Sequence, residues 1–162
     1  MKKQEVQFHE IQRFRQWWLW LPLLIMTLAL IYNLANHWIK GGDINYFALV
    51  FPTTIMLLVI LLFALSKLET FIKEDGIYVK FFPFHWSFRK FEWQDLEKAH
   101  LRQYSALSEF GGWGVRWGLG GKAYNVAGKW GIQLLTKKGN SLLIGTRQAD
   151  EVRAILAAIH KV

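Results

Sequence analysis

Cysteine is absent from this 162-residue chain, and proline occurs only three times. Without cysteine, the chain can form neither a disulfide framework nor a thiolate metal site. Charge is also absent from two long stretches: residues 17–39 and residues 46–65 contain no Asp, Glu, Lys or Arg. A helix at the surface of a soluble protein keeps one polar face, so these two stretches differ from ordinary surface helices.

Each uncharged stretch is long enough to cross a lipid bilayer. The two are 23 and 20 residues long, and a helix of about 20 apolar residues spans the hydrocarbon core. The six residues between them suffice only for a tight turn. The sequence therefore predicts a transmembrane helical hairpin over residues 17–65, with helices at 17–39 and 46–65. Burial of both helices in a soluble core is disfavoured, because a core helix seldom runs so long without a polar face.

The distribution of basic residues predicts the orientation of this hairpin. The turn carries only Lys40, which Asp43 offsets, whereas the part after residue 65 carries fifteen Lys or Arg against nine Asp or Glu. Four basic residues precede the first apolar stretch: Lys2, Lys3, Arg13 and Arg15. Because Lys and Arg are retained on the cytoplasmic side, we expect a multi-pass protein with both termini in the cytoplasm.

Aromatic residues at the ends of the two stretches are candidate anchors at the membrane interface. Their rings are apolar and carry a polar N–H or O–H, which suits the headgroup level. The candidates are Trp17, Trp18, Trp20, Trp38 and Tyr46.

Residues 1–16, a predicted cytoplasmic segment, allow two structures. Phe8, Ile11 and Phe14 lie near helical spacing, which favours a short amphipathic helix on the inner leaflet. Val6 and Phe8 also alternate with polar neighbours, which favours a strand. Both alternatives remain open.

Residues 66–162 predict one cytoplasmic α+β domain. Alternating apolar and polar residues favour short strands near 68–72, 77–81, 85–91, 98–104, 132–136 and 142–145, with a hairpin turn at Asp75-Gly76. Val152, Ile155, Leu156 and Ile159 then form one apolar helix stripe. We expect a strongly bent antiparallel sheet or open barrel that the C-terminal helix closes at one end.

The glycine-tryptophan segment, residues 111–122, is the most unusual part of this domain, since six of its twelve residues are glycine. One interpretation places it against anionic headgroups, with basic neighbours that add to the attraction. The candidate contacts are then Trp113, Arg116, Trp117, Lys122 and Lys129. The other interpretation is a structural hairpin, rich in β-bulges, whose tryptophans pack on the sheet or against the transmembrane helices. Residues 118–123 partly match the dinucleotide fingerprint G-x-G-x-x-A, but that motif needs a strand before it and a helix after it, and residues 124–128 favour a strand or turn.

Signals for catalysis or metal binding are weak. The chain has no H-E-x-x-H motif, no G-x-S-x-G elbow and no close cluster of His, Asp and Glu. We therefore expect no enzyme activity, cofactor, metal or small-molecule substrate. The basic residues are dispersed and match no motif of a known nucleic-acid-binding domain. Attraction to the inner face of a membrane therefore explains the positive charge better than nucleic-acid binding does.

Four segments together resemble a known family. They are KEDGIYVKFFPF at residues 73–84, FEWQDL at 91–96, AYNVAGKWGIQL at 123–134 and LLIGT at 142–146. With two N-terminal membrane helices before them, they resemble small bacterial membrane proteins that carry a bacterial pleckstrin-homology-like (PH-like) domain. The resemblance implies a bent sheet of about seven strands capped by the C-terminal helix, a place in the bacterial inner membrane, and no catalytic residues.

These observations favour a non-enzymatic module that is anchored at the inner leaflet. Its partners would be the lipid bilayer and either another protein or a second copy of the chain, with contact to anionic headgroups at the glycine-tryptophan segment. Two alternatives are an accessory subunit of a larger transport or secretion complex and a membrane-surface enzyme, which would need a pocket with convergent titratable groups.

Overall fold

The computed structural model describes residues 6–40, 46–118 and 120–159, with the side chains of Val6 and Tyr46 excepted. Contacts divide the chain into two compact units. One unit is Phe14–Ser66, and the other combines the residues up to Arg13 with those from Lys67 onward.

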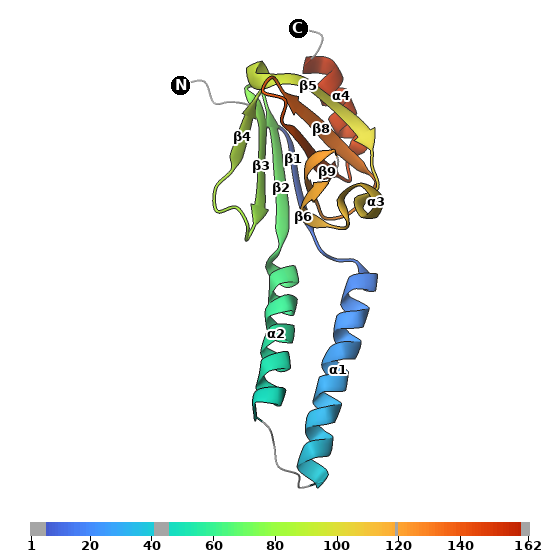
Figure 1. Cartoon of the computed structure of the whole chain (residues 1–162). Coiled ribbons are helices and arrows are strands. Elements are labelled where there is room, and N and C mark those ends of the chain that lie inside the picture. The colour runs from blue at the N-terminus through green and yellow to red at the C-terminus, as the bar shows by residue number, and fades with distance from the viewer. Residues whose placement is uncertain (1–5, 41–45, 119, 160–162) are drawn as a thin grey trace. The chain divides into compact units, whose positions relative to one another are not determined.

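Two helices make up the first unit: α1 (Trp17–Lys40) and α2 (Tyr46–Leu65), shown in blue and green in Figure 1. Both are long and apolar enough to cross a membrane, and no described residue of α1 is buried. Three of their polar side chains, Thr27, Asn33 and Thr53, each donate to the carbonyl one turn earlier, at 2.7–2.8 Å. The expected pair of long apolar helices is confirmed.

The second unit begins with a four-stranded antiparallel sheet. Its strands are β1 (Val6–Arg13), β2 (Lys67–Lys73), β3 (Gly76–Phe82) and β4 (Arg89–Glu92), in the order β1-β2-β3-β4. The N-terminal segment is therefore a strand in its described part, and β1 pairs with β2 although the whole helical unit separates them in sequence. β2 and β3 alternate between buried and half-exposed residues, as the sequence pattern predicts.

The expected strand over residues 85–91 is wrong in its first half. Residues 83–88 form the loop between β3 and β4. The backbone N–H of His85 donates to the Phe81 carbonyl at 2.7 Å, and its Nδ1 accepts from the Phe81 N–H at 3.2 Å. These two bonds close a turn, so pairing with β3 resumes only at Arg89, opposite Val79.

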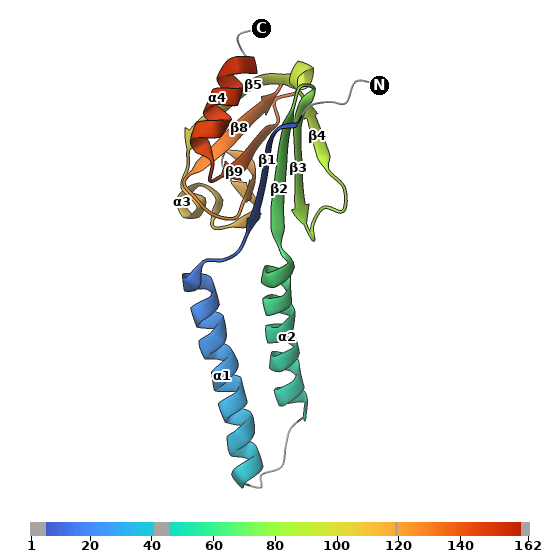
Figure 2. The ribbon, with the colours of Figure 1, turned by 180° about the vertical axis from the view of Figure 1, so that it is seen from behind.

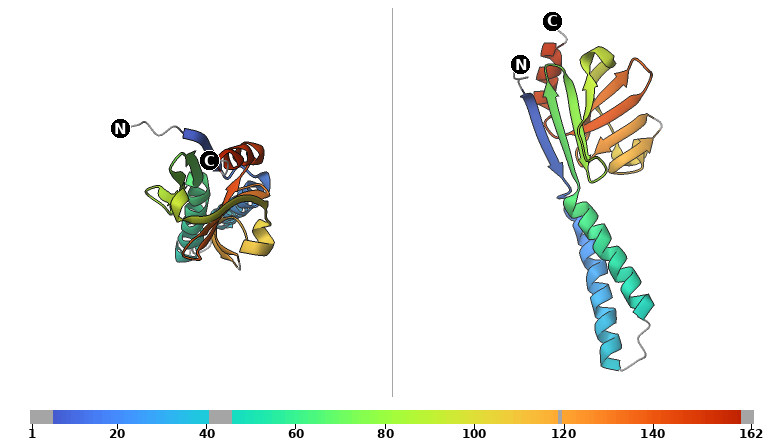
Figure 3. Two further views of the ribbon diagram at one scale, coloured as in Figure 1. Left: turned by 90° about the horizontal axis from the view of Figure 1, so that it is seen from above. Right: turned by 90° about the vertical axis from the view of Figure 1, so that its left-hand side faces the viewer.

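A five-stranded sheet follows after the 3-10 turn η1 (Trp93–Asp95). Its strands are β5 (Leu96–Gln103), β6 (Gly114–Gly118), β7 (Gly121–Asn125), β8 (Trp130–Thr136) and β9 (Ser141–Thr146). The spatial order is β5-β8-β9-β7-β6, and the short helix α3 (Ala106–Phe110) lies between β5 and β6 in the chain. Figure 3 shows the two sheets from two further sides.

The described residues thus contain nine strands in two sheets, where the sequence predicted one antiparallel sheet of about seven. The N-terminal segment and the β6–β7 hairpin supply strands that the sequence pattern left open. One pair, β7 with β9, is parallel. The chain reverses once between β7 and β8 and again between β8 and β9, so β7 and β9 run in the same direction on neighbouring positions. The α+β class is confirmed.

The C-terminal helix α4 (Ala149–Ile159) packs on β5 and touches β1, as Figure 2 shows from behind. Val152 and Leu156 form its buried stripe, as predicted. Glu10 of β1, which is buried, binds the turn before this helix: its Oε2 accepts from the Thr146 hydroxyl at 2.7 Å and its Oε1 from the Arg147 N–H at 2.9 Å. β1 is therefore joined to both sheets and to the base of α4.

Candidate functional site

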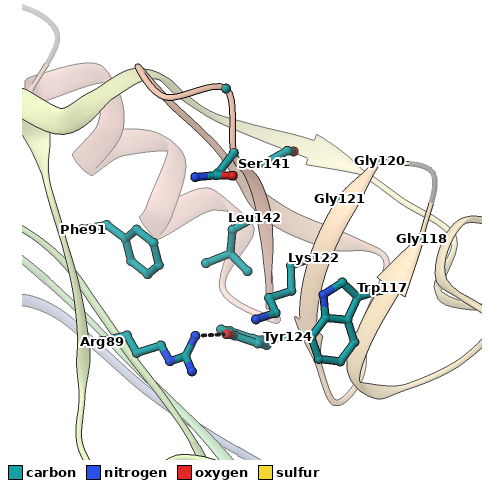
Figure 4. Close-up of a pocket in the computed structure, with 12 residues that line it drawn as sticks. Arg89, Phe91, Trp117, Gly118, Gly120, Gly121, Lys122, Tyr124, Ser141 and Leu142 are labelled. Carbon is teal, nitrogen blue, oxygen red and sulfur yellow. Dashed lines mark hydrogen bonds between the residues drawn. The ribbon is translucent and has the colours of Figure 1, made fainter.

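A cleft of about 730 Å³ opens in the β domain between the edge strand of the first sheet and the β6–β7 hairpin of the second. Figure 4 shows Arg89 and Phe91 of β4 facing the side chains of β7 across this cleft. The lining residues are Arg89, Phe91, Trp117, Gly118, Gly120, Gly121, Lys122, Tyr124, Gly139, Asn140, Ser141 and Leu142.

Positive charge dominates this cleft. Its lining includes Arg89 and Lys122 but no Asp or Glu. Arg89 donates from Nη1 to the Tyr124 hydroxyl at 3.1 Å, and the Nζ of Lys122 lies 4.6 Å from the centre of the Trp117 ring. Within the part of the chain that the structure describes, neither cation forms an ion pair. Two uncompensated cations beside an exposed indole favour the binding of an anionic group.

Buried aromatic groups support the inner side of this cleft. Tyr124 is fully buried, and burial raises the pKa of its hydroxyl. The His85 ring packs edge-on against Tyr124 with ring centres 4.9 Å apart. Burial lowers the pKa of His85, and the charges of Arg89 and Lys122 lower it further. His85 is therefore neutral at neutral pH, and the positive potential of the cleft comes from Arg89 and Lys122 alone.

Glycines bring the β6–β7 hairpin close to its neighbours. A Cβ on Gly118 would collide with the carbonyl oxygen of Glu109 in α3. Gly121 has a φ of +100°, and a Cβ there would lie 2.6 Å from the Ser141 carbonyl oxygen of β9. The glycines thus allow β6 and β7 to pack tightly at one end of the sheet, which leaves Trp117 and Lys122 at the mouth of the cleft.

The five residues proposed for headgroup contact lie in different surroundings. Trp117, which is 70% exposed, and Lys122 lie together in the cleft. Trp113 instead packs against a buried cluster that contains Tyr104 and Phe110, as the hairpin alternative predicted. Arg116 and Lys129 are exposed outside the cleft lining, and Arg116 donates from Nε to the Trp113 carbonyl at 2.8 Å.

Sequence reasoning missed Arg89 and Tyr124, which complete the cationic side of the cleft. They are 35 residues apart in sequence and belong to different sheets, so no local pattern connects them. The sequence contained one signal for Arg89: this positive charge directly follows the aromatic run at residues 84–88.

The proposed interface anchors all belong to the helical unit. Trp17, Trp18 and Trp38 are exposed, and Trp20 is partly exposed and donates from Nε1 to the Phe14 carbonyl at 2.8 Å. Tyr46 begins α2, and its side chain lies outside the described residues.

Among the described residues, no three His, Asp or Glu side chains gather in a way that could hold a metal ion. Comparison of the chain with protein-family models, with curated proteins and with solved structures found no match.

Proposed function

We propose that this chain is a membrane-anchored PH-like module that acts by binding at the inner leaflet of the bacterial cytoplasmic membrane, without catalysis. In this proposal α1 and α2 cross the bilayer as a hairpin, and both termini and the β domain are cytoplasmic. The PH-like description is supported by the order of elements: a four-stranded antiparallel sheet, a second sheet and a C-terminal helix packed on β5.

The observation that carries the membrane anchor is the exposure of the two helices. Large apolar side chains are exposed along both, among them Leu24, Ile31, Val50 and Leu58. Apolar surface left in water costs about 25 cal/mol per Å², so two helices of this length would be strongly unfavourable as solvated elements. In a bilayer, lipid covers these side chains and the cost of exposing them to water does not arise. A lipid environment also explains why α1 has no buried residue among those described.

The cleft supports binding of an anionic group. Its cations, Arg89 and Lys122, have no carboxylate partner among the residues that the structure describes, and its aromatic residue Trp117 offers an apolar face beside them. We propose that a protein partner or a second copy of the chain places an acidic side chain there, and that anionic headgroups compete for the same cations. Tethering to the membrane raises the effective concentration of headgroups and of membrane-bound partners near the cleft. A site of low affinity is therefore still occupied.

The topology can be tested with single cysteines, because the natural chain has none. Asn45→Cys, between α1 and α2 in the sequence, should react with a membrane-impermeant maleimide in intact cells, and Lys138→Cys in the β8–β9 turn should react only after permeabilisation. The reverse pattern, or equal labelling of both, would contradict the proposed orientation.

The binding role can be tested by crosslinking from the cleft in native membranes. A photoreactive amino acid at Trp117 should capture a partner or a second copy, and Lys122→Ala should reduce the yield. Lys129→Ala is the matched control, since it removes an equal charge from an exposed residue outside the cleft. An equal effect of the two alanine variants would refute a specific role for the cleft.

A further inference from the structure

The loop between β3 and β4, residues 83–88, exposes three large aromatic side chains. Phe84 is 55% exposed, Trp86 82% and Phe88 39%. A soluble domain usually scatters exposed apolar side chains singly. Three aromatic rings in one six-residue loop therefore indicate a surface that is covered by an apolar or interfacial partner.

The loop holds these rings on a fixed base. His85 lies between Phe84 and Trp86 in sequence and is buried, with its backbone and its ring both bonded to Phe81. The Trp86 ring packs edge-on against Phe82 at 5.8 Å between ring centres, which keeps it beside the end of β3 while it stays exposed. A loop held in this way loses little conformational freedom when its aromatic residues are buried.

The register of the sheet places the start of this loop beside the chain's connections to the two helices. Phe82 pairs with Lys67, and Lys67 pairs with Arg13. Lys67 lies two residues after the end of α2, and Arg13 lies four residues before the start of α1. The loop therefore starts at the end of the sheet from which the chain continues into both helices.

Basic side chains outnumber acidic ones at the same end of the sheet. Arg13 and Lys67 pair at the end of β1 and β2, and the Nζ of Lys80 lies 5.5 Å from the Phe88 ring. Glu69 compensates part of this charge, since its Oε2 lies 3.5 Å from the Nζ of Lys67. Tryptophan and basic side chains together are typical of segments that lie in the headgroup layer of an anionic leaflet.

We infer that the β3–β4 loop enters the headgroup layer of the membrane that α1 and α2 cross, with Trp86 as the deepest residue of the β domain. This inference rests on the membrane anchor proposed above. The loop gives the tethered domain a second attachment point, which restricts how it rotates over the bilayer. None of the three exposed aromatic residues lines the cleft at Arg89 and Lys122, so the proposed contact is additional to the one at the cleft.

The inference can be tested with three single-cysteine variants of the full chain in vesicles of neutral and anionic lipid. Each carries an environment-sensitive dye: Trp86→Cys in the loop, Glu74→Cys in the β2–β3 turn at the opposite end of the same sheet, and Leu58→Cys in α2. Trp86 and Glu74 are both exposed, so neither change disturbs the core. The measurements are the emission maximum and quenching by lipids labelled either at the headgroup or deep in the acyl chain.

We expect the dye at residue 86 to shift to the blue and to lose intensity with headgroup-labelled lipid, while residue 74 keeps its emission in water. If residue 58 is quenched by deep-labelled lipid but residues 86 and 74 behave alike, the loop does not enter the membrane and the inference is overturned. A blue shift at residue 86 without lipid quenching overturns it as well, because protein then covers the loop. If residue 58 is not quenched, the proposed membrane anchor itself fails.

Discussion

Replacement of Glu10 by alanine should strongly destabilise the β domain. Glu10 is 7% exposed, and its two oxygens accept hydrogen bonds from the Thr146 hydroxyl and the Arg147 N–H. A hydrogen bond to a charged group contributes about 1.5–3 kcal/mol, and the Thr146 hydroxyl, which is buried, would lose its acceptor. The loss of both bonds therefore lowers the free energy of unfolding by about 3–6 kcal/mol.

This loss is large compared with the 5–15 kcal/mol that stabilises a typical domain. For a domain of about 100 residues, each 1 kcal/mol lowers Tm by about 4–8 °C, so we expect a fall of at least about 12 °C. Thermal unfolding of the full chain in detergent micelles, followed by near-UV circular dichroism, measures this shift. Near-UV signals report the packed aromatic residues of the β domain, for example Tyr124 beside His85.

Glu97→Ala provides the matched control, because Glu97 is exposed and its removal changes the net charge equally. A double-mutant cycle between Glu10→Ala and Thr146→Val isolates one of the two bonds, with a coupling of about 1.5–3 kcal/mol expected. If Glu10→Ala lowers Tm no more than Glu97→Ala, β1 is not held to β9 and α4 in this way.

Three further predictions concern the cleft and the hairpin beside it. The pKa of His85 is lowered in the folded state, so the unfolded chain takes up a proton at this residue at higher pH than the folded chain does. The free energy of unfolding should therefore decrease as pH falls below about 6.5. His85→Gln should remove part of this decrease, as measured by urea titrations at several pH values. Tyr124→Phe should remove the hydrogen bond from Arg89 at a cost of about 0.5–1.5 kcal/mol, and an unchanged urea midpoint would contradict the bond. Gly118→Ala should destabilise the domain by about 1–3 kcal/mol because its Cβ meets the backbone of α3, whereas Gly120→Ala, whose Cβ meets only side-chain atoms at 3.9 Å, should be tolerated.

Local patterns in the sequence account for the elements that the structure confirms. The absence of charge from residues 17–39 and 46–65 predicted two long apolar helices, and both are present. Alternation at residues 68–72 and 77–81 predicted β2 and β3, and the stripe that includes Val152 and Leu156 predicted the buried face of α4. Each of these patterns lies within one element, so its physical cause, burial of one face or of a whole helix, can be seen in a short window of sequence.

The candidate site could be predicted only in part. Trp117 and Lys122 were selected because tryptophan and basic residues gather in one glycine-rich segment, and they are neighbours on paired strands. Arg89 and Tyr124 could not be added to them, because their proximity depends on how the two sheets pack. Residues 85–88 were predicted to begin an aromatic strand over 85–91, whereas they lie in the loop before β4.

Sequence alone thus determined two apolar helices, a strand-rich domain after them and a helix near the C-terminus, because charge depletion and periodicity act within a few turns of chain. Only the tertiary structure decided that residues 6–13 form an edge strand beside β2, that β7 runs parallel to β9, and that Arg89 faces Lys122 across a cleft. These features arise from pairing and packing between residues that are far apart in the chain. A strand can pair with several other strands whose hydrophobic patterns fit equally well, and the packing of the whole core selects one arrangement.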